Sequence, residues 1–95
     1  MRRFVIERDI PGAGTLARDQ LRDAAQKSNG VLHELGPDIQ WIESNVTQDK
    51  LYCIYLARDE ALIRKHAEIS GFPASRISEV KRVIDPTTAS HQSGR

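Results

Sequence analysis

The sequence has few of the residues that mark disulfide frameworks, metal clusters and membrane spans. It contains one cysteine, one tryptophan and three histidines in 95 residues. A single cysteine excludes an internal disulfide and a paired-cysteine zinc site, which favours a reducing compartment. No apolar run approaches the roughly 20 residues of a membrane span, and no secretory signal opens the chain. These absences predict a cytoplasmic protein that does not contact membranes.

Charge of one sign does not accumulate in this chain either. Fourteen Lys and Arg face thirteen Asp and Glu, which gives a net charge of +1, and no long basic run occurs. Surfaces that bind nucleic acids need clustered positive charge. The sequence therefore predicts no nucleic-acid partner.

Common catalytic motifs are missing as well. There is no glycine-rich phosphate loop, no HExxH and no GxSxG. Residues 12–14 read Gly-Ala-Gly but lack the third glycine of a dinucleotide-binding loop, so they indicate a turn. We therefore expect no organic cofactor. The residues favour a protein without catalytic activity, but they do not exclude an enzyme.

Residues 39–57 carry the clearest local pattern, two strands around a tight polar turn. Residues 39–46 and 51–56 are rich in β-branched and aromatic side chains, which are typical of half-buried strands. If Gln48-Asp49 is a two-residue loop, Cys53 and Tyr55 share one face of the hairpin. Trp41, Glu43 and Ile54 share the other face, although a bulge would rearrange both sets. Because both faces hold large apolar groups, we expect the second face to be a subunit interface.

The remaining segments complete a β-α-β-β-α-β order. We expect a strand over 3–8, a helix that begins with Thr15 as N-cap and is interrupted at Asn29-Gly30, and a further helical turn over 31–35. A second helix runs from a capping Asp59 to Gly71, and a last strand covers 77–84. This order predicts an α+β, ferredoxin-like sandwich, with an antiparallel sheet, two helices on one face and the first and third strands in the centre. The domain would span residues 1–86, and residues 87–95 would form a polar tail.

Two residues could carry chemistry in this fold. His66 follows Leu62 by four positions and Ile63 by three, so it lies beside the apolar stripe of the second helix. It is either a buried structural histidine or a metal ligand or general base. Cys53 is either a small inert hydrophobe or a soft metal ligand and nucleophile. The two could meet only if Cys53 points toward the helices.

Other polar positions have simpler interpretations. Glu7, Arg8 and Asp9 are expected to be solvated charges at a strand end. Trp41 beside Glu43 suits either a small-molecule pocket or a dimer interface. His33 is expected on the surface of the short helical segment.

Four stretches resemble a family of short bacterial proteins that is catalogued as a domain of unknown function and contains a described nickel-binding protein. They are FVIERDIPGAG (4–14), LGPDIQWIESNVTQDKLYCIY (35–55), IRKHAEISGFPASRISEV (63–80) and VIDPTTA (83–89). The resemblance implies a ferredoxin-like homodimer that binds nickel(II), for sequestration or detoxification, with no established catalytic activity. Asn45 stands where the family pattern has an aromatic residue, and Arg58 stands where it has proline.

The expected partners are therefore a second copy of the chain and a divalent metal ion. Cys53 and His66 lie on the family pattern, and with His33 they form our predicted set of metal ligands, of which His66 is the first to test. Nickel(II) is compatible with imidazole, carboxylate and water ligands. Because histidines are few, such a site would use carboxylates or donors from two subunits.

Two alternatives stay open. The first is a small cofactor-free enzyme, isomerase or monooxygenase-like, of the dimeric α/β-barrel type, with His66, Cys53, Trp41 and Tyr55 around one cavity. A closed apolar pocket between helices and sheet would favour it, and a solid core would count against it. The second is a ligand-sensing or interaction module whose dimer face is the functional surface.

Overall fold

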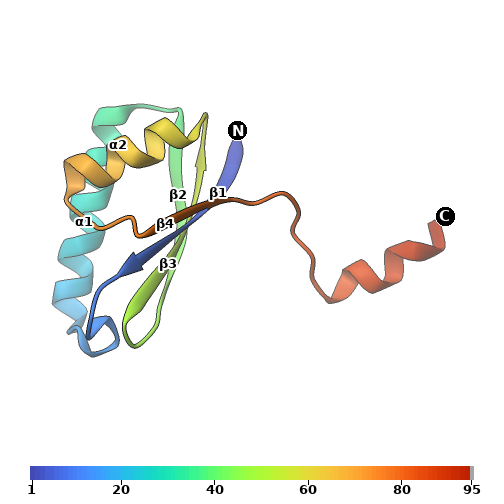
Figure 1. Cartoon of the computed structure of the whole chain (residues 1–95), viewed down its shortest axis with the longest axis horizontal. Coiled ribbons are helices and arrows are strands. Elements are labelled where there is room, and N and C mark those ends of the chain that lie inside the picture. The colour runs from blue at the N-terminus through green and yellow to red at the C-terminus, as the bar shows by residue number, and fades with distance from the viewer. Residues whose placement is uncertain (95) are drawn as a thin grey trace.

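A computed structural model describes the backbone of residues 1–94 and the side chains of residues 1–90. One four-stranded sheet carries both long helices on the same side (Figure 1). This architecture confirms the predicted α+β class. The elements are β1 (Arg2–Asp9), η1 (Ala13–Thr15), α1 (Arg18–Leu35), β2 (Ile39–Val46), β3 (Lys50–Ala57), α2 (Glu60–Ser70), β4 (Arg76–Glu79) and η2 (Pro86–Gly94), where η denotes a 3-10 helix.

The sheet has the strand order β2-β3-β1-β4, and each neighbouring pair is antiparallel. The first and third strands are therefore central, as predicted, and the order matches the ferredoxin-like arrangement. Phe4 pairs with Tyr55 and Ile6 with Cys53. Since alternate residues of a strand point to the same side, these four side chains all face the helices.

The core lies between this side of the sheet and the two helices. Both ends of α2 follow the sequence pattern: Asp59 Oδ1 accepts the Leu62 N–H at 3.1 Å, and Gly71 ends the helix in the left-handed region with φ 79°. The buried hydrophobic cluster consists of Phe4, Ile6, Ile39, Cys53, Tyr55, Ala57 and Ile63.

Helix α1 differs from the prediction at both of its expected breaks. The helix starts at Arg18 after Ala17, and the Thr15 hydroxyl donates instead to the Gly12 carbonyl at 2.7 Å, so Thr15 is not the N-cap. The helix also continues through Asn29 and Gly30 to Leu35. It does so because residues beyond the expected break, such as Val31, are buried against the core, and packing outweighs the weak helix propensity of glycine.

The β2–β3 hairpin has the expected two-residue loop and an additional bulge. Thr47 N–H donates to the Lys50 carbonyl at 2.8 Å, which confirms the loop at Gln48-Asp49. The register shifts between Trp41 and Glu43, so that Trp41 pairs with Tyr55 while Glu43 pairs with Ile54. The prediction that Trp41 shares a face with Glu43 is therefore wrong, because the extra residue turns Trp41 toward the helices.

The C-terminal segment leaves the sheet earlier than predicted. Strand β4 ends at Glu79, whereas the sequence favoured a strand over 77–84. Residues 81–90 are exposed, and this arm runs away from the body and from both helices to η2 (Figure 1). The domain boundary that we predicted after residue 86 stays a prediction. Arg95, the last residue of the predicted tail, lies outside the described residues.

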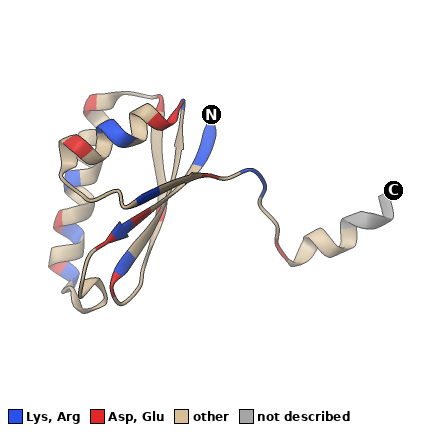
Figure 2. Ribbon diagram, viewed as in Figure 1, with Lys and Arg blue, Asp and Glu red and all other residues tan. Residues whose placement is uncertain are grey.

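The helical surface carries charges of both signs. Figure 2 shows Lys and Arg alternating with Asp and Glu along the outer side of α1. Within residues 1–94, no helix combines the length and the apolar character that crossing a bilayer requires.

Gly30 and Gly14 give a matched test of how tightly the chain packs around each of these two positions. A Cβ added at Gly30 would meet no atom within 4 Å, so we expect Gly30→Ala to raise the free energy of unfolding by about 0.5–1 kcal/mol. A Cβ at Gly14 would lie 2.9 Å from the Gln48 Cα, so Gly14→Ala should lower it. Urea unfolding of both variants checks the pair. Equal effects of the two substitutions would contradict this account.

Candidate functional site

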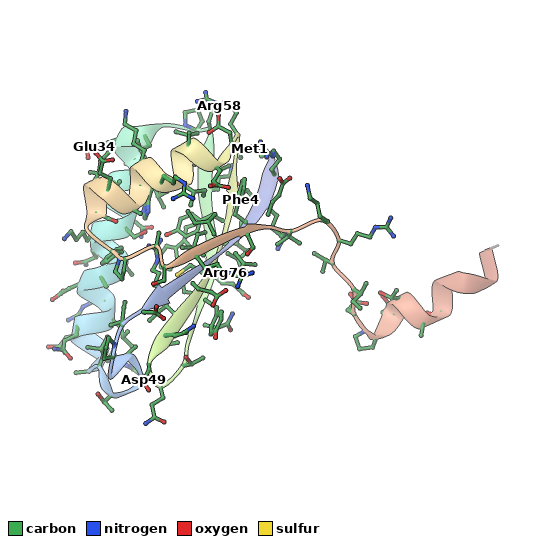
Figure 3. All side chains as sticks on the ribbon, in the orientation of Figure 1. Met1, Phe4, Glu34, Asp49, Arg58 and Arg76 are labelled. Atoms are coloured by element: carbon green, nitrogen blue, oxygen red, sulfur yellow. The ribbon has the colours of Figure 1, made fainter. Side chains whose placement is uncertain are left out.

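A group of five side chains that carry nitrogen, oxygen or sulfur atoms lies buried between the helices and the sheet, in the layer where Figure 3 labels Phe4. We call them the buried polar cluster, and none of them is more than 4% exposed. Polar groups are buried this completely only when they are hydrogen-bonded or when they serve a ligand. The members are Arg8, Ser28, Cys53, Tyr55 and His66.

The fold brings these residues together from four elements. Arg8 follows Ile6 by two positions on β1, so the strand period turns it toward the helices. The same period places Cys53 and Tyr55 on that side of β3. Ser28 comes from the middle of α1 and His66 from the buried stripe of α2.

Ser28 connects one half of the cluster. Its Oγ lies 3.1 Å from His66 Nε2 and 3.2 Å from the Tyr55 hydroxyl. The rings of Tyr55 and His66 are also in contact, with centroids 5.2 Å apart. This chain of contacts satisfies the two hydroxyls and one ring nitrogen without water.

Burial controls the protonation of the two rings. It lowers the pKa of His66 to about 4, and the positive charge of Arg8 acts in the same direction, whereas a hydrogen bond with Ser28 opposes it. Burial also raises the pKa of Tyr55. The imidazole and the phenol are therefore both neutral at pH 7.

Arg8 occupies the other half of the cluster. Its Nη1 donates to the Pro73 carbonyl at 3.0 Å, and its Nε donates to Cys53 Sγ at 3.4 Å. Its Nη2 is buried and has no hydrogen-bond partner among the described residues. The guanidinium also lies 5.6 Å from the Phe72 ring and 5.9 Å from the Tyr55 ring, each measured to the centroid.

A cavity of about 210 Å³ adjoins the cluster between α1 and the sheet. Arg8, Ser28, Cys53 and Tyr55 form part of its wall, and His66 does not. The rest is mainly apolar and includes Leu16, Leu21, Ala24, Trp41, Val46 and Leu51. The space between the helices and the sheet is thus not the solid core that would have counted against the enzyme alternative.

The predicted metal ligands fall into two places. Cys53 faces the helices and belongs with His66 to the buried polar cluster, while His33 is exposed in the last turn of α1. Among the described side chains, no group of three or more His, Cys, Asp and Glu could hold a metal ion. The buried pair also suits a cation poorly, because Cys53 Sγ accepts from a guanidinium and Ser28 already contacts His66 Nε2.

Two residues of this site escaped the sequence reasoning. Arg8 was expected to be a solvated charge, yet it is 2% exposed; its place two residues after Ile6 was the signal for burial. Trp41 was assigned to the opposite face, and its true position depends on the bulge in β2.

Comparison with known proteins places the chain beside one described group. A family model described as nickel responsive protein SCO4226-like matches residues 4–80. The crystal structure of SCO4226 from Streptomyces coelicolor A3(2) has a TM-score of 0.70 to this chain at 20% sequence identity. The match covers 86% of this chain and 99% of that one, and at this identity it shows a shared fold. No curated protein matches the sequence.

The depressed pKa of His66 predicts a pH-dependent stability. Because the folded pKa of about 4 lies below the ordinary 6.5, the unfolded chain takes up the proton first as the pH falls. The stabilisation is complete above the ordinary value and is lost progressively toward pH 4, with a size on the order of 2 kcal/mol.

Chemical denaturation near neutral pH and near pH 5 measures this effect. We expect His66→Gln to lose less free energy of unfolding between the two conditions than the wild type does. The exposed His33→Gln variant serves as the control. An unchanged pH dependence in His66→Gln would contradict the assignment.

Proposed function

The chain belongs to the SCO4226-like family of nickel-responsive proteins, and on that premise we propose that it is a small metal-binding protein for nickel(II). The family match over residues 4–80 is the observation that carries this proposal. Direct binding of the ion is the simplest physical basis for a response to nickel. Sequestration or detoxification is the role that we propose for it.

The environments of His33, His66 and Cys53 decide which of these three ligands to test first. Nickel(II) binds imidazole well, and the His33 side chain is exposed at the end of α1. A metal ion at His66 or Cys53 would have to displace the contacts of Ser28 and Arg8 and approach a buried positive charge. These contacts favour His33 over the buried pair as the first nickel ligand.

Calorimetric titration of chelator-stripped, tag-free protein with nickel tests the proposal, and zinc and cobalt provide the comparison. We expect saturable nickel binding at a whole number of ions per chain. We expect His33→Ala to weaken it by about tenfold or more, since one inner ligand is lost. His66→Gln and Cys53→Ser should retain it.

The possible results of these titrations test the metal-binding function and the choice of His33 as ligand separately. Nickel binding that fails to saturate in the wild type would contradict the metal-binding function. Nickel binding that survives in His33→Ala but disappears in a folded His66→Gln variant would move the site to the buried polar cluster. Circular dichroism of each variant confirms that the fold is intact.

We also propose that the protein is a homodimer through the open face of the sheet. On the side away from the helices, β1 and β3 present Val5, Tyr52, Ile54 and Leu56, all of them partly exposed. A chain of 95 residues buries a limited core, so covering this apolar face would stabilise it.

Sedimentation equilibrium tests the dimer. Ile54→Asp places a charge on the open face and should give a monomer, because a carboxylate there would be buried without a partner. Ile69→Asp puts the same change on the exposed side of α2, where Ile69 is 47% exposed, and should stay dimeric. A monomeric wild type, or a dimeric Ile54→Asp variant, would contradict this interface.

The cavity favours a second function, that of a small-molecule binder or a cofactor-free enzyme. Its wall includes Ser28 and Tyr55, and Ser28 contacts the neutral imidazole of His66. An imidazole with a pKa near 4 is a weak base, so this chain of contacts is poorly matched to proton abstraction at pH 7. The cavity therefore supports ligand binding more strongly than it supports an isomerase or a monooxygenase.

A further inference from the structure

Arg8 is the charged residue in the wall of the cavity. The side chain is 2% exposed, and its hydrogen bonds from Nη1 and Nε go to a carbonyl oxygen and a sulfur atom. Neither acceptor is a carboxylate. A buried guanidinium without a carboxylate is unfavourable unless another negative group reaches it.

The unsatisfied nitrogen of Arg8 is the donor that such a group would use. Nη2 of Arg8 is buried and has no hydrogen-bond partner among the described residues, whereas Nε and Nη1 are already engaged. The neighbouring Ser28 and Tyr55 hydroxyls contact each other. The cluster thus offers one unused charged donor, which matches one oxygen of a carboxylate better than the several oxygens of a phosphate.

The remainder of the wall defines the body of the ligand. Leu16, Leu21, Ala24, Trp41 and Val46 line the cavity with apolar surface. The volume of about 210 Å³ is larger than the roughly 150 Å³ of a cavity that holds benzene. A single aromatic ring or a short aliphatic chain fits this space.

We propose that the cavity binds a small monocarboxylate with an apolar body, whose carboxylate accepts a hydrogen bond from Arg8 Nη2. The hydrocarbon part lies between α1 and the helix-facing side of β2 and β3. This site is independent of the proposed nickel site, because His33 does not line the cavity and the bound group is an anion. The two proposals can therefore fail separately.

Trp41 provides a direct signal for the test. It is the single tryptophan of the chain, it lines the cavity, and its Nε1 donates to Ser44 Oγ at 3.0 Å. Metal-free protein is titrated with phenylacetate, with the neutral phenylacetamide of nearly the same shape, and with acetate, which lacks the apolar body. Tryptophan fluorescence follows each titration, and amide chemical shifts locate the bound compound.

We expect phenylacetate to bind saturably and about tenfold or more tightly than phenylacetamide, because only the acid offers a charged acceptor to Arg8. Acetate should bind more weakly than phenylacetate. The backbone amide signals that shift on phenylacetate binding should include those of Leu21, Trp41 and Val46. Arg8→Met, which keeps a long side chain without the charge, should remove the preference for the acid over the amide. The exposed Arg76→Met variant should keep it.

The comparison of acid and amide on the wild type needs no variant, so a failure of Arg8→Met to fold does not prevent a decision. Equal affinity for phenylacetate and phenylacetamide would overturn the role of Arg8. A folded Arg8→Met variant that still prefers the acid would do the same. Absence of saturable binding by phenylacetate, or shifts confined to residues outside the cavity, would overturn the site itself.

Discussion

The pairing of β1 with β3 positions every strand residue of the buried polar cluster. The ladder runs from Arg2↔Ala57 to Asp9↔Lys50 without a register shift, and it places Ile6 opposite Cys53 and Phe4 opposite Tyr55. A slip of one residue would turn the buried set of one strand toward the open face. The hydrophobic core and the placement of Arg8 therefore depend on the same register.

The charge of Arg8 organises the chemistry on this side of the sheet. It contributes to the low pKa of His66, it contacts Cys53 Sγ, and it adjoins the cavity. A buried positive charge repels a metal cation and attracts an anion. The nickel site that we propose and the cavity thus concern different parts of the molecule, because the exposed His33 does not line the cavity.

Local sequence patterns predicted the class of fold, whereas the positions of the site residues depended on tertiary packing. Asp59 and Gly71 mark the ends of α2 in the sequence because a cap and a left-handed glycine are local features. The burial of Arg8 was visible only as a two-residue period that conflicted with its charge, and charged strand ends are usually solvated. The bulge at Ile42 and the contact of Ser28 with His66 depend on tertiary packing, so periodicity alone left them open.

The bulge in β2 also bears on how copies of the chain can associate. Strand β2 lies at one border of the sheet and β4 at the other, so both leave backbone N–H and C=O groups without a neighbouring strand. Edge strands of this kind can pair with a strand of another chain, which leads to strand addition and the growth of fibrils. Here one border is interrupted between Trp41 and Glu43, and the other is only four residues long. Continuous strand addition is therefore opposed at both borders.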